Sequence, residues 1–403
     1  MTQVEAFPPF DVGSLAPNIL RPFAGRVATP MTRLVCPTCH AKFHPAAVAF
    51  RCTGEPAVCP PEYDRVVGAR LGAGEPPLMP HAVPPQGGLL RRIGARVLPP
   101  RRVACDLCGT QTDHRLCPAC HAPLPRSLGA VDVLPIVVAG TTGAGKSTWL
   151  AALADRLEGG AGAAAGAAFW PESDWAERRL RQFYRDPLYA QGRALRPTPS
   201  AAKDGAVLEP LFLRYDQRQG RGALLALHDT SGADFASDAG AAIYAQAIAG
   251  AGGLVFLIAP EDLPEFGGNA QASAAAFGRI VAALEAAGRA RPDASFDLPV
   301  ALVLAKLDRM QPSLPEGIDM LAPADPGAIG LAPASDEVAA YLAAWHGGAV
   351  PALLRARFPN HACFAASALG RAPNGDIVEP PRPFRVEEPM LWLLAAMGRM
   401  RVP

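Results

Sequence analysis

Charged residues and long apolar runs are scarce in this chain of 403 residues. Aspartate, glutamate, lysine and arginine make up 19% of it and nearly cancel, which leaves a formal net charge of +1. So small a charge excludes a global field that would hold a nucleic acid or an acidic membrane by long-range attraction. No stretch reaches the about 18 apolar residues of a membrane helix, and the first thirty residues lack the apolar core of a signal peptide. We therefore expect a cytoplasmic protein with no membrane partner.

Hydrophobic residues, by contrast, make up 50% of the chain. This share excludes disorder of the whole chain, and the length suits one large or two modest domains. Composition and motifs divide the sequence into an N-terminal tail (1–30), a cysteine-rich part (31–125) and a larger part (131–403).

Eight of the nine cysteines lie before residue 121, mostly in C-x2-C knuckles. A knuckle points two thiolates at one position, and two pairs of thiolates complete a tetrahedral zinc site. We expect two zinc ions, each held by cysteines that are consecutive in the sequence. The first set is Cys36, Cys39, Cys52 and Cys59, and the second set is Cys105, Cys108, Cys117 and Cys120.

Three alternatives to this ligand assignment stay open. His40 or His44 could replace Cys52 or Cys59 in the first set, which has only one knuckle. The two sets could also be interleaved, or the cysteines could form disulfides, which a reducing compartment disfavours. Cys363 stands apart in an apolar stretch, as a buried core residue would.

The arginine-rich stretch from Arg91 to Arg102 raises the question of nucleic-acid binding. Residues 1–130 contain 14 lysines and arginines against 8 aspartates and glutamates. Two zinc ions with four thiolates each would add a formal charge of about −4, which removes most of this excess. No aromatic residue stands among the arginines to stack on bases. Nucleic-acid binding is therefore less favoured than a structural or partner-docking role, and residues 60–104 are expected to be a spacer.

Residues 131–157 contain a phosphate-binding loop (P-loop) in its required setting. Val133–Ala139 predicts a strand and Thr148–Leu157 a helix, and GTTGAGKS between them matches G-x-x-x-x-G-K-[ST]. In such a loop, backbone N–H groups surround the β-phosphate, the lysine reaches the β- and γ-phosphates, and the serine hydroxyl binds Mg²⁺. We assign nucleotide binding to Gly140, Thr141, Thr142, Gly143, Ala144, Gly145, Lys146, Ser147 and Thr148.

A second phosphate-facing element follows a predicted hairpin of two strands, Pro210–Tyr215 and Ala223–His228. Asp229 ends the second strand, where its carboxylate can hold Mg²⁺ through water, and Gly232 of D-x-x-G can offer its N–H to a γ-phosphate. Thr198 is the candidate for a further Mg²⁺ hydroxyl. The predicted catalytic residues are thus Lys146, Thr198, Asp229 and Gly232, and the predicted Mg²⁺ ligands are Ser147, Thr198 and Asp229.

Apolar strands then alternate with helices, which implies a parallel sheet covered on both faces. The strands are Gly252–Pro260, Pro299–Asp308 and one at the start of His361–Gly370, and the helices are Ala270–Ala287, Asp336–Arg355 and a closing Met390–Met400. The fold class is therefore α/β, a three-layer P-loop fold with a mostly parallel sheet and one antiparallel strand, preceded by a small double zinc-ribbon module. The stretches 159–168 and 309–334 are expected to be loops.

Two short motifs point to a guanine site. Lys306 and Asp308 fit the N/T-K-x-D pattern except at its first position, and an aspartate there accepts two hydrogen bonds from guanine N1 and N2. Ser367 and Ala368 fit the S-A-x loop that approaches guanine O6 with a backbone N–H. The alternatives are an ordinary solvated strand end and a plain small-residue loop.

With these motifs, residues 131 to about 400 resemble a P-loop GTPase domain of the translation-factor-related (TRAFAC) class. The zinc module, the AKLD and SAL variants and the ending PFRVEEPMLWLLAAM are similar to the bacterial double-GTPase family. This resemblance implies a Mg²⁺-dependent GTP switch or assembly regulator in a multi-protein conflict or defence system, with proteins of the same system as partners.

Two departures from a standard GTPase affect this interpretation. Ala233 stands where the water-orienting glutamine is expected, and Ala305 replaces the first residue of the base motif. The leading hypothesis is a GTPase with GTP, Mg²⁺ and two Zn²⁺ as cofactors. The alternatives are a nucleotide-binding scaffold with weak turnover and a zinc-ribbon nucleic-acid-binding ATPase.

Overall fold

The computed structural model describes most of the chain. The described residues are 33–71, 75–85, 100–204, 209–217, 222–310, 336–342 and 349–400. The predicted N-terminal tail, most of the arginine-rich stretch and the predicted loop from residue 311 onward lie outside these ranges.

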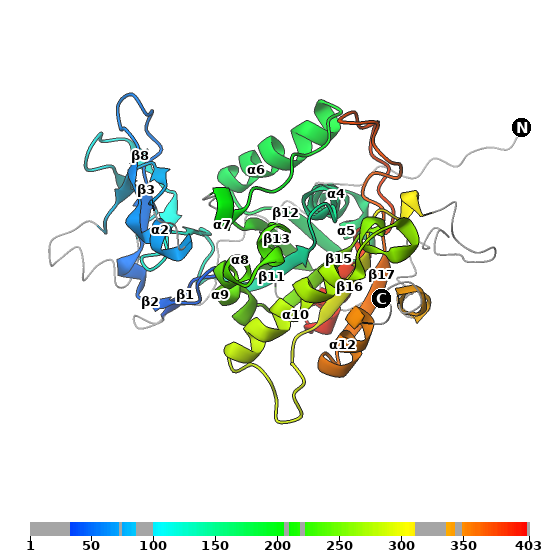
Figure 1. Ribbon diagram of the computed structural model, residues 1–403. Helices are drawn as coiled ribbons and strands as arrows, with labels where there is room; N and C mark the ends of the chain where they lie inside the picture. The colour runs from blue at the N-terminus through cyan, green and yellow to red at the C-terminus, as the bar shows by residue number, and fades with distance from the viewer. Residues whose placement is uncertain are drawn as a thin grey trace, which may run out of the picture.

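A seven-stranded sheet forms the centre of the larger part, in the order β12-β13-β14-β11-β15-β16-β17 (Figure 1). Strands β14, β11, β15, β16 and β17 are parallel to one another, whereas β13 runs antiparallel to both its neighbours. The predicted α/β class with one antiparallel strand is confirmed. The strands are β11 (Asp132–Gly140), β12 (Ala167–Pro171), β13 (Leu211–Gln217), β14 (Ala223–Asp229), β15 (Gly253–Ile258), β16 (Val300–Leu304) and β17 (His361–Ala365).

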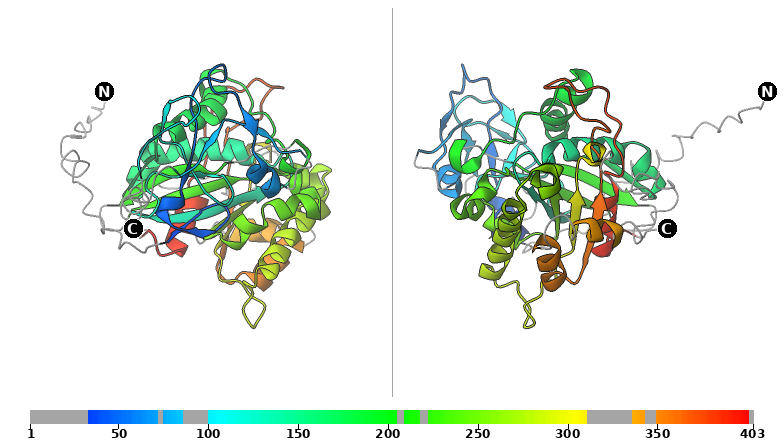
Figure 2. Two further views of the ribbon diagram at one scale, coloured as in Figure 1. Left: turned by 90° about the vertical axis from the view of Figure 1, so that its left-hand side faces the viewer. Right: turned by 45° about the vertical axis from the view of Figure 1, so that its right-hand side comes forward.

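Helices cover both faces of the sheet (Figure 2). Alternate residues of β11 point to opposite faces: Ile136 and Val138 pack into one core, Val137 and Ala139 into the other. The first core is closed by α4 (Lys146–Glu158), the π-helix Arg181–Ala190 and α13 (Glu388–Ala396). The second is closed by α8 (Asp238–Ile243), α9 (Ala245–Ala249), α10 (Ala270–Ala286) and α12 (Ala349–Arg357). This arrangement is the predicted three-layer fold.

Two segments differ from their predicted structure. The stretch 159–168 was expected to be a loop, yet it contains α5 (Gly160–Ala164) and the start of β12. Gly162 permits this, because a Cβ there would lie 2.3 Å from the carbonyl oxygen of Leu157. The helix expected at Asp336–Arg355 is described as a helical segment at 336–342 and as α12.

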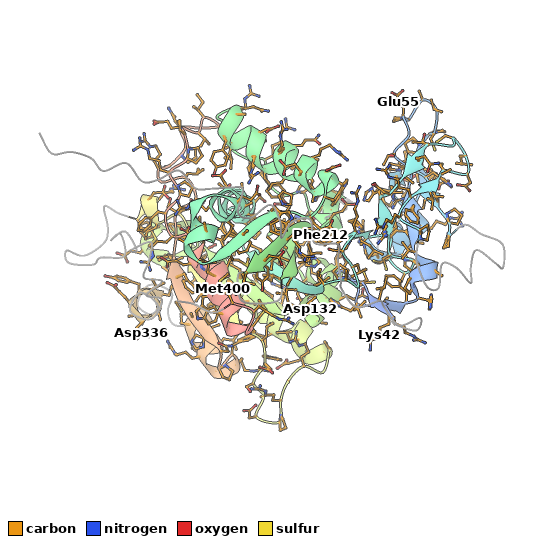
Figure 3. All side chains as sticks on the ribbon, turned by 180° about the vertical axis from the view of Figure 1, so that it is seen from behind. Lys42, Glu55, Asp132, Phe212, Asp336 and Met400 are labelled. Carbon is orange, nitrogen blue, oxygen red and sulfur yellow. The ribbon has the colours of Figure 1, made fainter. Side chains whose placement is uncertain are left out.

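We use the name cysteine module for the described residues between 33 and 125. Its secondary structure consists mostly of two- and three-residue strands and one α-helix, α2 (Arg65–Leu71). Residues 60–104 are therefore not merely a spacer, because α2 and the strand pair Glu62–Tyr63 and Leu78–Met79 belong to the module. Figure 3 shows the module, marked by Lys42 and Glu55, on the side of the sheet where Phe212 of β13 lies.

No helix among the described residues is long and apolar enough to cross a membrane.

Candidate nucleotide and metal sites

The P-loop connects β11 to α4 and takes its shape from three glycines with positive φ. Gly140 has φ 145°, and a Cβ there would lie 2.4 Å from the carbonyl oxygen of Leu257 on the neighbouring strand. Gly143 and Gly145 have φ 80° and 85°, a region that L side chains rarely adopt. The loop therefore curls over the carboxyl end of the sheet and delivers the chain directly into the N-terminus of α4, a ready-made anion site.

Lys146 lies at the bottom of this loop with its side chain almost fully buried. Its Nζ donates to the carbonyl oxygens of Gly140, at 3.0 Å, and Thr141, at 2.8 Å. Burial lowers the pKa of Lys146 to about 8. The ammonium group thus lies within the loop where the motif requires it, while Thr142 and Gly143 remain exposed at the mouth.

The three residues predicted to bind Mg²⁺ converge beside the P-loop. The Ser147 hydroxyl donates to Oδ2 of Asp229 at 2.7 Å and lies 2.7 Å from the Thr198 hydroxyl. Since the Ser147 proton is committed to Asp229, Thr198 is the donor to Ser147. Burial raises the pKa of Asp229, and its Oδ1 atom has no hydrogen-bond partner among the described residues. Two hydroxyls and one carboxylate with an unused oxygen suit Mg²⁺, which prefers hard oxygen ligands.

Gly232 packs directly on the P-loop. A Cβ at this position would lie 2.4 Å from the carbonyl of Thr141 and 2.4 Å from the amide nitrogen of Thr142. Only glycine fits so close an approach, and the contact places the turn after Asp229 against the phosphate loop.

The predicted base-site residues also lie together at the carboxyl end of β16 and β17. The Ser367 hydroxyl donates to Oδ1 of Asp308 and accepts from the amide of Gly370 at 2.8 Å. Lys306 has φ 55°, and its Cε would lie 3.7 Å from a Cβ on Gly145. The lysine stem therefore lies over the P-loop, while Ala368 packs at the edge of the first core.

The cysteines form two clusters, but the consecutive ligand assignment is wrong. The first cluster contains Cys36, Cys39, Cys117 and Cys120, and the second cluster contains Cys52, Cys59, Cys105 and Cys108. Two Sγ–Sγ distances in each cluster lie between 3.5 and 4.0 Å, too long for a disulfide and close to the edge of about 3.8 Å of a tetrahedron with 2.3 Å Zn–S bonds. Backbone N–H groups point at Sγ of Cys36, Cys52 and Cys117. Each cluster therefore fits zinc, with ligands interleaved along the chain.

The two histidines considered as zinc ligands have other contacts. His44 accepts a hydrogen bond from the amide of Ala46 at 3.2 Å and caps a short 3-10 helix. The His40 ring lies against Gly250, where a Cβ would be 1.9 Å away. Neither belongs to a cluster.

The part of the chain that carries the P-loop, Asp229 and Lys306 matches a known family. Residues 134–330 match the family model described as Double-GTPase 2. This match confirms the predicted resemblance to the double-GTPase family. The Double-GTPase 2 region contains the P-loop, Thr198, Asp229, Gly232 and Asp308, whereas both cysteine clusters and Ser367 lie outside it.

Solved structures with similarity to this chain include several GTPases, all at low TM-scores. The small GTPase Arl6 BBS3 from Trypanosoma brucei, with bound GppNp, is 12% identical over 67% of this chain and 99% of its own, with a TM-score of 0.31. The signal recognition particle receptor complex SRb-GTP/SRX from Chaetomium thermophilum is 14% identical over 60% of this chain and 94% of its own (TM-score 0.28). A bacterial selenocysteine-specific elongation factor, EF-Sec, is 14% identical over 59% of this chain and 26% of its own, with a TM-score of 0.25. No curated protein matches the chain.

One residue that sequence reasoning missed in the Double-GTPase 2 region is Tyr184. It lies in the π-helix that continues α6 (Asp174–Leu180), and its hydroxyl donates to Oδ2 of Asp229 at 3.2 Å. Burial raises the pKa of Tyr184, so the phenol stays protonated as a donor. The N-cap Ser173 and the acidic first turn of α6 signal a helix here, but nothing local points Tyr184 at Asp229.

Asp234 is a second residue whose contacts the sequence does not indicate. It is fully buried, and its carboxylate accepts from the hydroxyl of Ser200, the amide of Ala201 at 3.0 Å and the hydroxyl of Tyr244 at 2.8 Å. Asp234 therefore ties α7 (Ala201–Asp204), which follows Thr198, to the turn that follows Asp229.

Proposed function

We propose that this chain is a Mg²⁺-dependent GTP-binding protein that hydrolyses GTP slowly and acts as a switch. The match to the Double-GTPase 2 family supports guanine-nucleotide binding. The observation that carries the proposal is the convergence of Ser147, Thr198 and Asp229 next to the buried Lys146. Partner proteins of one bacterial conflict or defence system are the proposed readers of the switch.

In this proposal the chain binds the triphosphate with P-loop amides and the Lys146 ammonium group. Bound Mg²⁺ supplies charge neutralisation on the β- and γ-phosphates. Ser147 and Thr198 offer hydroxyl ligands to that ion, and Asp229 holds its water shell through Oδ1. Gly232 offers its N–H to the γ-phosphate. Lys306 and Asp308 hold the base, with Ser367 fixing the Asp308 carboxylate.

Slow turnover follows from what surrounds the expected attacking water. Ala233 has no group to orient it, and the Asp234 carboxylate is already engaged by hydroxyls and an amide. The specific alternative is a nucleotide-binding scaffold that scarcely hydrolyses. Calorimetric titration of the protein with GTP and ATP in Mg²⁺, followed by single-turnover phosphate release, tests both. GTP binding with release supports the GTPase, binding without release supports the scaffold, and binding of neither nucleotide contradicts the proposal.

Asp308→Asn is expected to weaken selection of guanine over adenine by about tenfold or more, since a hydrogen bond to a charged group is worth about 1.5–3 kcal/mol. The amide of asparagine can still accept from Ser367 but offers guanine N1 and N2 only one acceptor oxygen. Competition between GTP and ATP for the site measures the ratio, and Asp155→Asn, an exposed aspartate of α4, is the control. An unchanged ratio in Asp308→Asn would show that the base lies elsewhere.

Tyr184→Phe is expected to raise the Mg²⁺ concentration that half-saturates nucleotide retention by about 3- to 10-fold. The change removes only the hydroxyl that steadies Asp229, so nucleotide affinity in chelator should not move. Dissociation of a fluorescent GTP analogue across a Mg²⁺ series measures both quantities. Tyr215→Phe is the matched control, because this buried tyrosine donates to the carbonyl oxygen of Arg399, far from the site. Equal Mg²⁺ requirements in both variants would remove Tyr184 from the site.

A further inference from the structure

The cysteine module packs on the two segments that carry Thr198 and Gly232. Figure 1 shows α2 beside α7 and α8. On α2, the buried side chains of Val67 and Leu71 form one apolar cluster with Ala201, the first residue of α7, and with Ile243, the last of α8. Helix α7 begins three residues after Thr198, and α8 follows the Asp229 turn. The module thus covers the outer side of both segments, opposite the P-loop.

A second contact joins the first cysteine cluster to the strand that ends in Asp229. The Nε2–H group of His228 donates to the carbonyl oxygen of Pro37 at 3.2 Å, and Pro37 lies inside the knuckle of Cys36 and Cys39. A small cavity of about 40 Å³ between module and sheet is lined by Thr38 and by Asp229 itself. The knuckle therefore lies directly behind the residue proposed to hold the Mg²⁺ water shell.

The third contact is the close approach of His40 to Gly250, the C-cap of α9. The His40 ring occupies the space that a side chain at residue 250 would need.

The first cluster is also linked rigidly to α2. His121 follows Cys120, and its Nδ1 lies 2.8 Å from Oδ2 of Asp64. Asp64 accepts from the amide of Val67 at 3.0 Å, which caps α2, and pairs with Arg51 at 2.9 Å. A chain of polar contacts thus runs from the cysteine cluster to the helix that covers α7 and α8.

From these contacts we propose that docking of the cysteine module is coupled to the nucleotide, so that the module raises affinity for a triphosphate over a diphosphate. The proposal rests on the proposed function. The module holds the Thr198 and Gly232 segments against the P-loop, and Asp234 makes the two segments one unit. Gly232 and Thr198 add binding contacts only when a γ-phosphate is present. Loosening the module should therefore lower the affinity for GTP and leave the affinity for GDP unchanged. By linkage, a triphosphate tightens docking by the same factor.

The test is a substitution at Gly250 that pushes the cysteine module away from α9. Gly250 has φ −98°, so alanine suits its backbone, but its Cβ would displace the His40 ring. Gly250→Ala should weaken binding of a non-hydrolysable GTP analogue about fivefold or more while GDP affinity stays within about twofold. Gly278→Ala in α10, where a Cβ meets nothing within 4 Å, is the matched control. Val67→Ala removes apolar contact at α2 instead and should act in the same direction.

Hydrogen exchange of residues 65–71 supplies the reciprocal readout. In the wild-type protein, the GTP analogue should slow exchange there more than GDP does, and Gly250→Ala should abolish the difference. Faster exchange of residues 65–71 in the two variants would show that the module is loosened. If the ratio of analogue affinity to GDP affinity is nevertheless unchanged in both, the proposed coupling is wrong, while the proposed function still stands. Failure of the wild-type protein to bind either nucleotide would instead refute the proposed function itself.

Discussion

Lys146→Ala is expected to reduce affinity for GTP by about 30-fold or more, because truncating one partner of a buried charge pair costs about 2–5 kcal/mol. The Nζ atom lies inside the P-loop, 2.8 Å from the carbonyl oxygen of Thr141. A triphosphate held there without the ammonium group would keep its amide contacts but lose the one cation that the described part of the loop supplies. Calorimetric titration with GTP and Mg²⁺ measures the loss.

The Lys146 variant should not lose binding by unfolding. Burial lowers the pKa of Lys146, so removal of its buried charge offsets part of the loss of its hydrogen bonds to the carbonyl oxygens of Gly140 and Thr141. Thermal melting without nucleotide should therefore give a midpoint close to that of the wild-type protein. Lys42→Ala, at an exposed position of the cysteine module, is the control and should bind GTP normally. Wild-type affinity in Lys146→Ala would place the nucleotide outside the P-loop.

The sequence predicts the P-loop well because every determinant of that loop is local. Gly140, Gly143 and Gly145 adopt positive φ within a few residues of Lys146, and the flanking strand and helix have strong apolar periodicity. The same holds for β15, β16 and β17, whose apolar runs can only be buried strands. Strand β12 was missed because it is only five residues long and overlaps the glycine- and alanine-rich stretch 159–168, which carries almost no periodic signal; β12 forms by pairing with β13.

Contacts between distant segments could not be predicted in this way. Tyr184 meets Asp229 across 45 residues, and its orientation depends on a π-helix that the sequence does not signal. The sequence marks Thr198 only as a hydroxyl residue that precedes the predicted hairpin. Its contact with Ser147 depends on how the whole segment between α4 and β13 folds. The Asp234 carboxylate joins the Ser200 hydroxyl and the Ala201 amide to the Tyr244 hydroxyl, contacts that its place after D-x-x-G does not indicate.

The prediction that each zinc ion is held by four consecutive cysteines failed because contacts between distant segments decide the ligand sets. Knuckles are local, so each C-x2-C pair was identified correctly, but the choice of partner pair is made by the sheet that joins the two halves of the module. The strand Ala49–Arg51 pairs with Arg115–Leu116, which brings residues separated by more than sixty positions side by side. That register places Cys117 and Cys120 next to Cys36 and Cys39 rather than next to Cys105.

Removing zinc is expected to have the largest effect on stability, because cysteines make up nearly half of the buried core of the module. Six of the thirteen buried residues in this core are cysteines: Cys36, Cys52, Cys59, Cys105, Cys117 and Cys120. The strands of the module are only two or three residues long and add few hydrogen bonds of their own. Structural zinc in such small modules contributes about 10–16 kcal/mol at neutral pH. A strong chelator should therefore unfold the module, seen as rapid hydrogen exchange across residues 33–71 and 100–125.

Zinc content distinguishes the interleaved clusters from consecutive ones. The wild-type protein should contain two zinc ions per chain, and Cys363→Ala, which removes the cysteine outside both clusters, should keep both. The double variant Cys36→Ser, Cys117→Ser damages only the first cluster if ligands are interleaved, so one zinc ion should remain, whereas consecutive ligation predicts the loss of both. Cys36→Ser, Cys52→Ser should show the reverse: interleaving predicts the loss of both ions and consecutive ligation the loss of one. Atomic absorption on purified protein reads out each case, and four equal zinc contents would mean that these cysteines hold no metal.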